Sequence, residues 1–219
     1  MTKNYILKIR DLSGFLVFPL LGLMYEFLNE RQTNAVDMTA PADAFIPFVP
    51  VFILPYIIWY VYMFGFLLFF WWRDSHIYWK TVIALTAGEL ICFCVYFFFQ
   101  STVPRPELTG DGFLIHLVSV IYQNDQPFNC FPSIHVLTTF IIMLVLPKLK
   151  LSRMVSFISQ LTGILIILST LFVKQHVIYD VIASIALGLS IWYILFEFKR
   201  APARLPSVTK ERVSERNAG

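Results

Sequence analysis

The chain has 219 residues, of which 58% are hydrophobic and only 14% charged, and its mean hydropathy is +0.69. This composition excludes an ordinary soluble domain and favours a membrane protein. The net charge of +3 is small, so nothing in the charge balance calls for a nucleic-acid partner.

Apolar runs near the ~20 residues needed to cross a bilayer recur along the chain, separated by short polar joints. They predict an all-α polytopic membrane protein, a bundle of six transmembrane helices that forms a single domain over residues 1–200. In chain order the predicted spans are Leu12–Asn29, Pro47–Trp71, Lys80–Phe99, Phe131–Leu146, Ser152–Phe172 and Val177–Phe198. The fourth span is the shortest.

Several joints carry predictions of their own. Ala42-Asp-Ala44 resembles a signal-peptide cleavage site, but it lies well beyond the first apolar run, so we expect this run to be retained as the first helix. Phe113–Tyr122 predicts a short helix at the membrane interface. The polar tail, residues 201–219, is expected to be cytoplasmic and disordered. The three cysteines form no disulfide or zinc pattern.

The distribution of Lys and Arg predicts the orientation. If the N-terminus is cytoplasmic, all but three of the 17 Lys and Arg residues lie inside, and the three outside are Arg31, Arg105 and Lys174. The positive-inside rule therefore predicts a multi-pass protein of the cell membrane with both termini cytoplasmic. No Gly-x-x-x-Gly face occurs in any span, and the sequence leaves the oligomeric state open.

Polar residues that can carry chemistry gather at the joints predicted to lie outside. The most informative are His176 and Asp180, which are spaced i, i+4 and so share one face of a helix. A carboxylate there can hold the proton of one imidazole nitrogen and leave the other as a nucleophile or base. The alternative is an ion pair that only caps and orients the helix end.

Two further joints complete the set. In Pro132-Ser133-Ile-His135, a helix start offers free amide groups and a hydroxyl to an anion, with His135 placed to donate a proton. Arg105 lies between two prolines, where a guanidinium suits bidentate phosphate binding. The alternatives are a structural histidine, an arginine that reaches the headgroups, and a metal site of His135, His176 and Asp180.

Taken in order, Arg105-Pro, Pro-Ser133-x-His135 and His176-x3-Asp180 resemble the three motifs of the type 2 phosphatidic acid phosphatase superfamily of membrane lipid phosphatases. The resemblance covers residues 104–180. Asp43-Ala-Phe-Ile-Pro-Phe-Val-Pro50 is also similar to the branch that contains the inositol phosphorylceramide synthases and their bacterial relatives.

The resemblance implies roles for these residues. His176 would attack phosphorus and become phosphohistidine, Asp180 would orient it, and His135 would protonate the leaving oxygen. Arg105 and Ser133 would hold the phosphate oxygens, with no metal or other cofactor. The active site would face the extracytoplasmic side.

Three positions depart from the family pattern. Phe98 stands where the family has a lysine, Ile134 where it has a glycine, and Thr170 where it has an arginine. Two basic phosphate ligands are therefore missing, and Lys174 is the candidate replacement. With fewer cations to neutralise developing charge, we expect either a different substrate or a lower activity.

The leading hypothesis is a lipid phosphatase for a phosphomonoester or pyrophosphate such as phosphatidic acid, phosphatidylglycerol phosphate or a polyprenyl pyrophosphate. A phosphotransferase that passes the phosphoryl-containing group to an alcohol would use the same intermediate. The third reading is a non-catalytic transporter or lipid-binding protein. The sequence leaves the roles of Asp43, Glu26 and Glu89 open.

Overall fold

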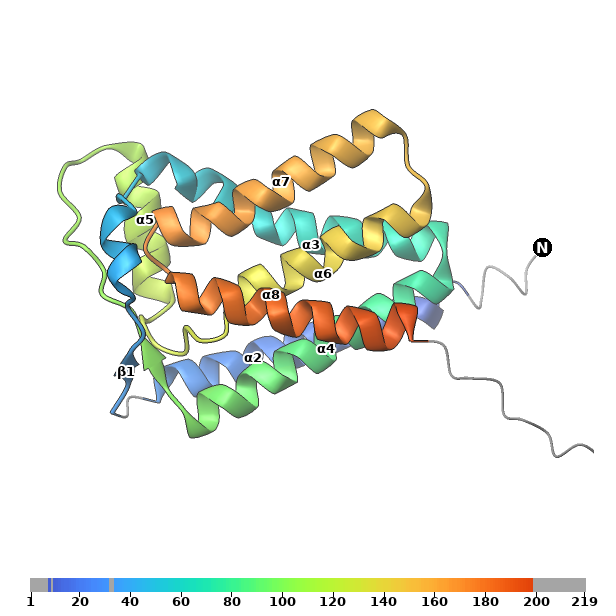
Figure 1. Ribbon diagram of the computed structural model, residues 1–219, viewed down its shortest axis with the longest axis horizontal. Helices are drawn as coiled ribbons and strands as arrows, with labels where there is room; N and C mark the ends of the chain where they lie inside the picture. The colour runs from blue at the N-terminus through green and yellow to red at the C-terminus, as the bar shows by residue number, and fades with distance from the viewer. Residues whose placement is uncertain (1–7, 9, 32–33, 199–219) are drawn as a thin grey trace, which may run out of the picture.

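The computed structural model describes residues 8, 10–31 and 34–198, so the predicted tail over 201–219 lies outside the described residues. Six helices run along one common axis (Figure 1): α2 (Val17–Glu30), α3 (Ile53–Arg73), α4 (Ser75–Phe98), α6 (Ile134–Val145), α7 (Arg153–Phe172) and α8 (Ile178–Trp192). A seventh, α5 (Phe113–Asn124), lies across one end of the bundle.

Short elements extend or connect these helices. Tight helical turns cover Leu12–Leu16, Pro41–Phe45, Pro50–Phe52 and Leu146–Leu149, and a π-helical turn covers Tyr193–Glu197. Strands β1 (Val36–Asp37) and β2 (Ser101–Thr102) form one short parallel pair. The prediction of an all-α fold is therefore confirmed for the described residues, apart from this pair.

Five helices are long and apolar enough to cross a membrane: Leu12–Glu30, Pro50–Arg73, Ser75–Phe98, Arg153–Phe172 and Ile178–Glu197. They correspond to five of the six predicted spans. The remaining one corresponds to Ile134–Leu149, which is apolar but shorter than the other five. A crossing by this helix stays a prediction.

The joint between the second and third spans is much shorter than predicted. We expected the third span to begin at Lys80, whereas α4 begins at Ser75, directly after α3 ends at Arg73. Asp74 makes this possible, because its carboxylate accepts hydrogen bonds from the backbone amides of His76 and Ile77 and so caps α4.

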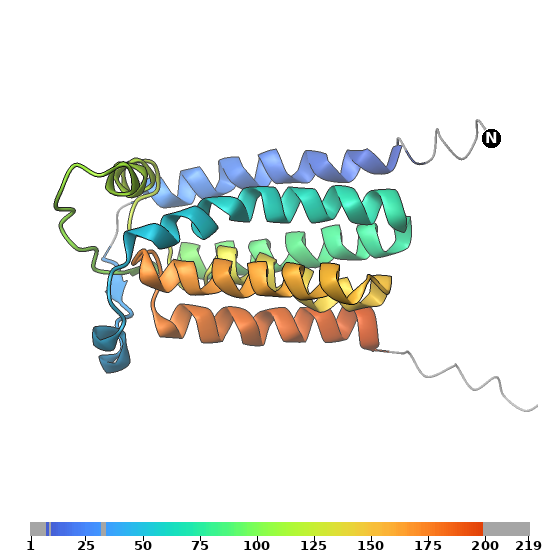
Figure 2. The same cartoon turned by 90° about the horizontal axis from the view of Figure 1, so that it is seen from above.

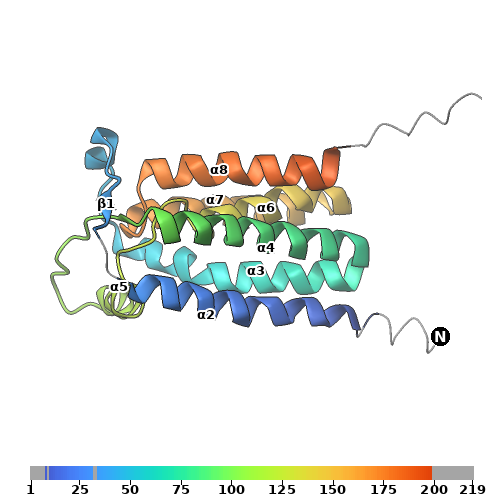
Figure 3. The ribbon, with the colours of Figure 1, turned by 90° about the horizontal axis from the view of Figure 1, so that it is seen from below.

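Helix α6 occupies the centre of the bundle, where it contacts α3, α4, α7 and α8 (Figures 2 and 3). Its side chains Val136, Leu137, Ile141, Ile142 and Val145 are fully buried. A helix that is apolar on all sides is stable only when other helices surround it. The short fourth predicted span is thus the core helix of the fold.

The outward faces of the surrounding helices are apolar as well. On α2, for example, Leu20, Leu23 and Phe27 are each more than half exposed. Apolar surface of this extent on several helices is typical of contact with lipid. The chain is therefore a multi-pass membrane protein.

The three polar segments of the sequence lie at the same end of the bundle. Helices α6 and α8 begin there, α4 and α7 end there, and α5 covers it, whereas α2 begins and α8 ends at the opposite end (Figure 1). The short helix predicted over Phe113–Tyr122 is present as α5.

Candidate active site

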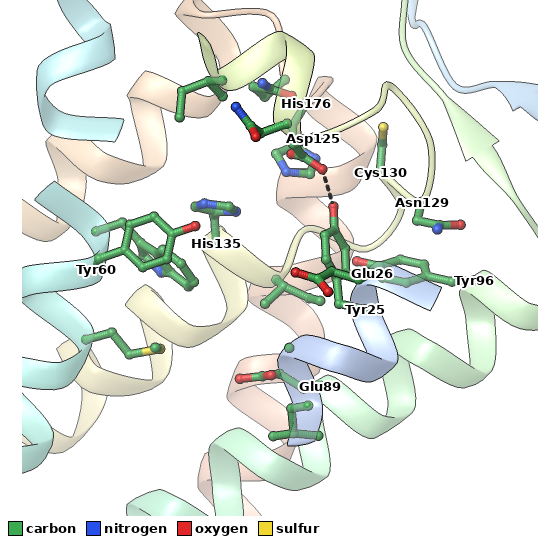
Figure 4. A pocket seen from close by; sticks show the side chains of 18 of the residues that line it. Tyr25, Glu26, Tyr60, Glu89, Tyr96, Asp125, Asn129, Cys130, His135 and His176 are labelled. Carbon is green, nitrogen blue, oxygen red and sulfur yellow. Dashed lines mark hydrogen bonds between the residues drawn. The ribbon is translucent and has the colours of Figure 1, made fainter. Parts of the chain in front are cut away.

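A cavity of about 420 Å³ opens into the bundle at this end. Its walls come from α2, α3, α4, the end of α5 and the segment after it, the start of α6 and the turn before α8 (Figure 4). Of the six residues predicted from the sequence, His135 and His176 line it.

His176 and Asp180 form a hydrogen-bonded pair. The distance from His176 Nδ1 to Asp180 Oδ2 is 3.2 Å, and the Asp180 side chain is fully buried. The same oxygen accepts a hydrogen bond from the backbone amide of Val177 at 3.0 Å, which caps the start of α8. Asp180 therefore orients the imidazole and caps the helix at once, leaving His176 Nε2 available to the cavity.

The turn that carries His176 is shaped by Thr170. Its backbone carbonyl accepts hydrogen bonds from the amides of both Gln175 and His176, at 3.0 and 3.1 Å. Lys174, which lies between the end of α7 and Gln175, adopts a left-handed backbone conformation with a φ of 56°. The position where the family has an arginine is thus fully buried here and supports the turn through its backbone.

His135 lies on the first turn of α6, between two aromatic rings. The centroid of its ring is 4.7 Å from that of Tyr56 and 4.1 Å from that of Trp59. Trp59 is itself held by a 2.9 Å hydrogen bond from its indole nitrogen to Thr138 Oγ1. The centroids of the His135 and His176 rings are 6.2 Å apart.

This separation matches the size of a phosphoryl group. A nucleophile lies about 3–3.5 Å from the atom it attacks, and a proton donor lies about 2.6–3.2 Å from its acceptor. One phosphoryl group between the two imidazoles can meet both requirements.

Arg105 does not line the cavity. Its guanidinium donates hydrogen bonds to the carbonyls of Tyr122 and Asp125, at 3.2 and 2.8 Å, and to Gln175 Oε1, and it stacks 4.4 Å from the Tyr122 ring. It thereby ties the end of α5 to the turn before His176. Of the three guanidinium nitrogens of Arg105, Nε is the one that is buried without a hydrogen-bond partner among the described residues.

Ser133 and Lys174 also have structural partners. Ser133 is the fully buried N-cap of α6, and its hydroxyl accepts a hydrogen bond from the amide of Val136. The Lys174 ammonium donates to the carbonyls of Asp43 and Ile46. Neither residue lines the cavity.

Asp43 anchors the loop before α3 to the start of α8. Its buried carboxylate accepts hydrogen bonds from the amides of Ala40 and Ile178, at 2.8 and 3.0 Å. Together with Lys174 it fixes the position of the turn that carries His176, which gives this residue a role that the sequence left open.

Sequence reasoning missed Asp125, which lies in the cavity wall near His176 (Figure 4). Its carboxylate accepts hydrogen bonds from the Tyr25 hydroxyl at 2.6 Å and from Asn29 Nδ2 at 3.1 Å. Burial raises the pKa of Asp125, although the Tyr25 hydrogen bond and the Arg105 guanidinium act in the opposite direction. No motif or spacing marks this residue in the loop where it occurs.

The two carboxylates left open by the sequence, Glu26 and Glu89, both line the cavity. Ile134, where the family has glycine, lines it too, whereas Phe98 is 84% exposed at the end of α4. The position of the expected lysine therefore faces away from the site.

Several nitrogen atoms around the histidines are buried without a hydrogen-bond partner in the described part of the chain. They are Asn129 Nδ2, Gln175 Nε2, Arg105 Nε and His135 Nε2. Buried donors normally find a partner, so the amide nitrogens of Asn129 and Gln175, both in the cavity wall, point to a ligand that accepts hydrogen bonds. In the same part of the chain, no group of three or more His, Cys, Asp and Glu side chains is arranged to hold a metal ion.

Comparison with known proteins gives one match. The model of the PAP2 superfamily matches residues 77–203, which is more than half of the chain. This range begins in α4, extends past the end of α8 and includes His135, His176 and Asp180. No curated protein and no solved structure matches the chain.

Proposed function

Because the chain belongs to the PAP2 superfamily, we propose that it is an integral membrane enzyme that cleaves a lipid phosphate ester or anhydride through a phosphohistidine intermediate. The observation that carries the proposal is the 3.2 Å pair of His176 and Asp180 facing His135 across 6.2 Å at the wall of one cavity. A nucleophile, the group that orients it and a proton donor are thus together.

In the first step, His176 Nε2 attacks phosphorus while Asp180 holds the proton on Nδ1. A bond from nitrogen to phosphorus forms, the bond from phosphorus to the leaving oxygen breaks, and His135 gives this oxygen a proton. The imidazole becomes cationic in this step, and the buried Asp180 carboxylate stabilises it.

In the second step, water attacks phosphorus from the side that the leaving group has vacated. His135 takes a proton from the water, the bond from nitrogen to phosphorus breaks, and His176 returns to its starting state. An alcohol in place of water would make the enzyme a phosphotransferase, with the same residues in the same roles.

The phosphate oxygens require hydrogen-bond donors during both steps. Amides of the first turn of α6 and the unpartnered amide nitrogens of Asn129 and Gln175 are the candidates, because both side chains line the same cavity as the histidines. Arg105, Ser133 and Lys174 then act mainly by positioning the walls of the site, because their polar groups already bind the protein.

We place the active site on the extracytoplasmic side of the cell membrane. By the bounds of the helices, the described Lys and Arg residues at the histidine end of the bundle are Arg31, Arg105 and Lys174. Those at the opposite end are Lys8, Arg10, Arg73, Lys80, Lys148, Lys150 and Arg153. The positive-inside rule puts the second group in the cytoplasm.

The test is product release by the purified full-length protein from a panel of lipid phosphates, with the variants His176→Ala and His135→Ala. The panel contains phosphatidic acid, phosphatidylglycerol phosphate, a polyprenyl pyrophosphate and lipid phosphodiesters. We expect both variants to lose activity while keeping the thermal unfolding curve of the wild type. Full activity in either variant contradicts the mechanism.

A second measurement addresses the intermediate directly. With a substrate whose phosphorus is radioactive, rapid denaturation is expected to leave acid-labile label on the wild-type protein and none on His176→Ala. Adding a strong chelator is expected to leave turnover unchanged, because no step in the mechanism uses a metal ion.

A further inference from the structure

The charge of the cavity differs from that expected for a site that binds a lipid phosphomonoester. Three carboxylates line it, Glu26, Glu89 and Asp125, and among the described residues no Lys or Arg does. A phosphomonoester carries between one and two negative charges at neutral pH, and it would face these carboxylates with no Lys or Arg side chain in the described cavity wall.

Glu89 is the most informative of the three. It is only 7% exposed, and in the described part of the chain it makes no hydrogen bond or ion pair. Figure 4 shows its carboxylate directed from α4 into the lower part of the cavity. A buried carboxylate without a partner is costly, so this position favours a ligand group that carries positive charge.

Aromatic rings line the space between the carboxylates and the histidines. Tyr25 and Tyr60 stand on opposite walls, on α2 and α3, and Glu26 lies next to Tyr25 (Figure 4). Aromatic faces attract ammonium groups. Rings and carboxylates together form a surface suited to an amine.

The phosphate end of the cavity offers neutral donors. Asn129 and Gln175 are 2% and 3% exposed, and each has an amide nitrogen without a hydrogen-bond partner among the described residues. Neutral amides can bind the single negative charge of a phosphodiester, whereas a doubly charged monoester needs the basic ligands that this chain lacks at Phe98 and Thr170.

We propose that the substrate is a phosphodiester lipid whose headgroup carries a protonated or quaternary amine, with the amine held by Glu26, Glu89 and the tyrosines. This inference rests on the proposed phosphohistidine chemistry and changes the substrate that the family resemblance predicts. Glu26 and Tyr60 lie on α2 and α3, outside the range matched by the family model, so specificity is set by a part of the chain that the match does not cover.

The bond that breaks follows from this placement. With the headgroup in the cavity, His176 Nε2 bonds to phosphorus and the bond from phosphorus to the glycerol oxygen breaks. His135 protonates that oxygen, and diacylglycerol leaves into the bilayer. Water then attacks phosphorus and gives a proton to His135, the bond from His176 nitrogen to phosphorus breaks, and the phosphorylated amino alcohol is released.

The first experiment compares lipids with identical acyl chains on the wild-type protein: phosphatidylcholine, phosphatidylethanolamine, phosphatidylglycerol and phosphatidic acid. We expect kcat/KM for the two amine lipids to exceed that for the other two by about tenfold or more, with diacylglycerol and the phosphorylated amino alcohol as products. Turnover of phosphatidic acid or phosphatidylglycerol at an equal or higher rate overturns the inference. A preference for hydroxyl-rich headgroups such as inositol also overturns it.

Two variants test the carboxylates. Glu26→Gln and Glu89→Gln are each expected to lower kcat/KM for phosphatidylcholine about tenfold and to reduce the preference over phosphatidylglycerol. The matched control is Glu30→Gln, because Glu30 is exposed on the same helix one turn away and does not line the cavity. If both variants keep the wild-type preference, the carboxylates do not bind the headgroup.

Binding to the inactive variant His176→Ala separates this inference from the proposed function. Short-chain phosphatidylcholine is expected to bind at least tenfold more tightly than phosphatidic acid of the same chain length, by calorimetric titration. If this preference is found but the wild type cleaves no lipid, the headgroup site stands and the proposed function fails. If the wild type cleaves phosphatidic acid best and needs His176, the proposed function stands and the headgroup site is wrong.

Discussion

Replacing Asp180 with asparagine separates the electrostatic role of this residue from its structural role. A single oxygen, Oδ2, accepts the hydrogen bonds from His176 Nδ1 and from the Val177 amide. The amide oxygen of asparagine can occupy the same place and keep both bonds. The fold and the cap of α8 are then retained, while the negative charge is lost.

The size of the effect follows from the geometry. When His176 attacks phosphorus, its ring becomes cationic at a distance of 3.2 Å from the Asp180 carboxylate. At an effective dielectric constant of about 20, two unit charges at that distance attract by about 5 kcal/mol. Because ~1.4 kcal/mol corresponds to a factor of ten in rate, we expect kcat to fall about 10²- to 10⁴-fold.

The assay is steady-state turnover of the best lipid substrate by Asp180→Asn, with thermal unfolding in the same detergent. Asp37→Asn is the matched control, because Asp37 is exposed on β1 and, among the described residues, its carboxylate bonds only to Thr39. We expect the control to keep wild-type turnover. A folded Asp180→Asn protein with kcat within tenfold of the wild type would refute the electrostatic reasoning.

Three other changes have defined outcomes. Asp43→Ala removes two buried hydrogen bonds, and we expect a loss of about 1–3 kcal/mol in the free energy of unfolding together with lower kcat; unchanged unfolding would contradict the anchoring role. Gly88→Ala would place a Cβ 2.8 Å from Leu137 in the core, and we expect it to lower the free energy of unfolding by about 1–3 kcal/mol. Gly65 has no neighbour within 4 Å, so Gly65→Ala is the control that is expected to show no such loss. Burial raises the pKa of Asp125, so the folded protein holds the carboxyl proton of this residue more tightly than the unfolded chain does. The free energy of unfolding is therefore expected to fall as pH rises from about 4 through the raised pKa. Asp125→Asn should remove this pH dependence, and an unchanged slope would assign the dependence to other groups.

The sequence alone predicted the features that depend on neighbouring residues. Apolar runs located the helices because a helix in lipid must present apolar side chains over its length. The i, i+4 spacing of His176 and Asp180 predicted their contact, although His176 lies in the turn before α8 and Asp180 reaches it from the first turn of that helix. The short length of the joint at Asp74 was not predicted, because a single capping residue can replace several loop residues. The disordered tail over 201–219 stays a prediction.

The cavity and its charge were decided by the tertiary structure. Tyr25 and Asp125 are 100 residues apart and share a hydrogen bond, and no local pattern in the sequence relates them. The sequence predicted Arg105 as a phosphate ligand. In the structure its guanidinium instead donates hydrogen bonds to the backbone carbonyls of Tyr122 and Asp125 at the end of α5. The sequence thus determined the helices and the pairing of His176 with Asp180 through local spacing, whereas the packing of α2 and α3 against the histidines decided which side chains line the cavity.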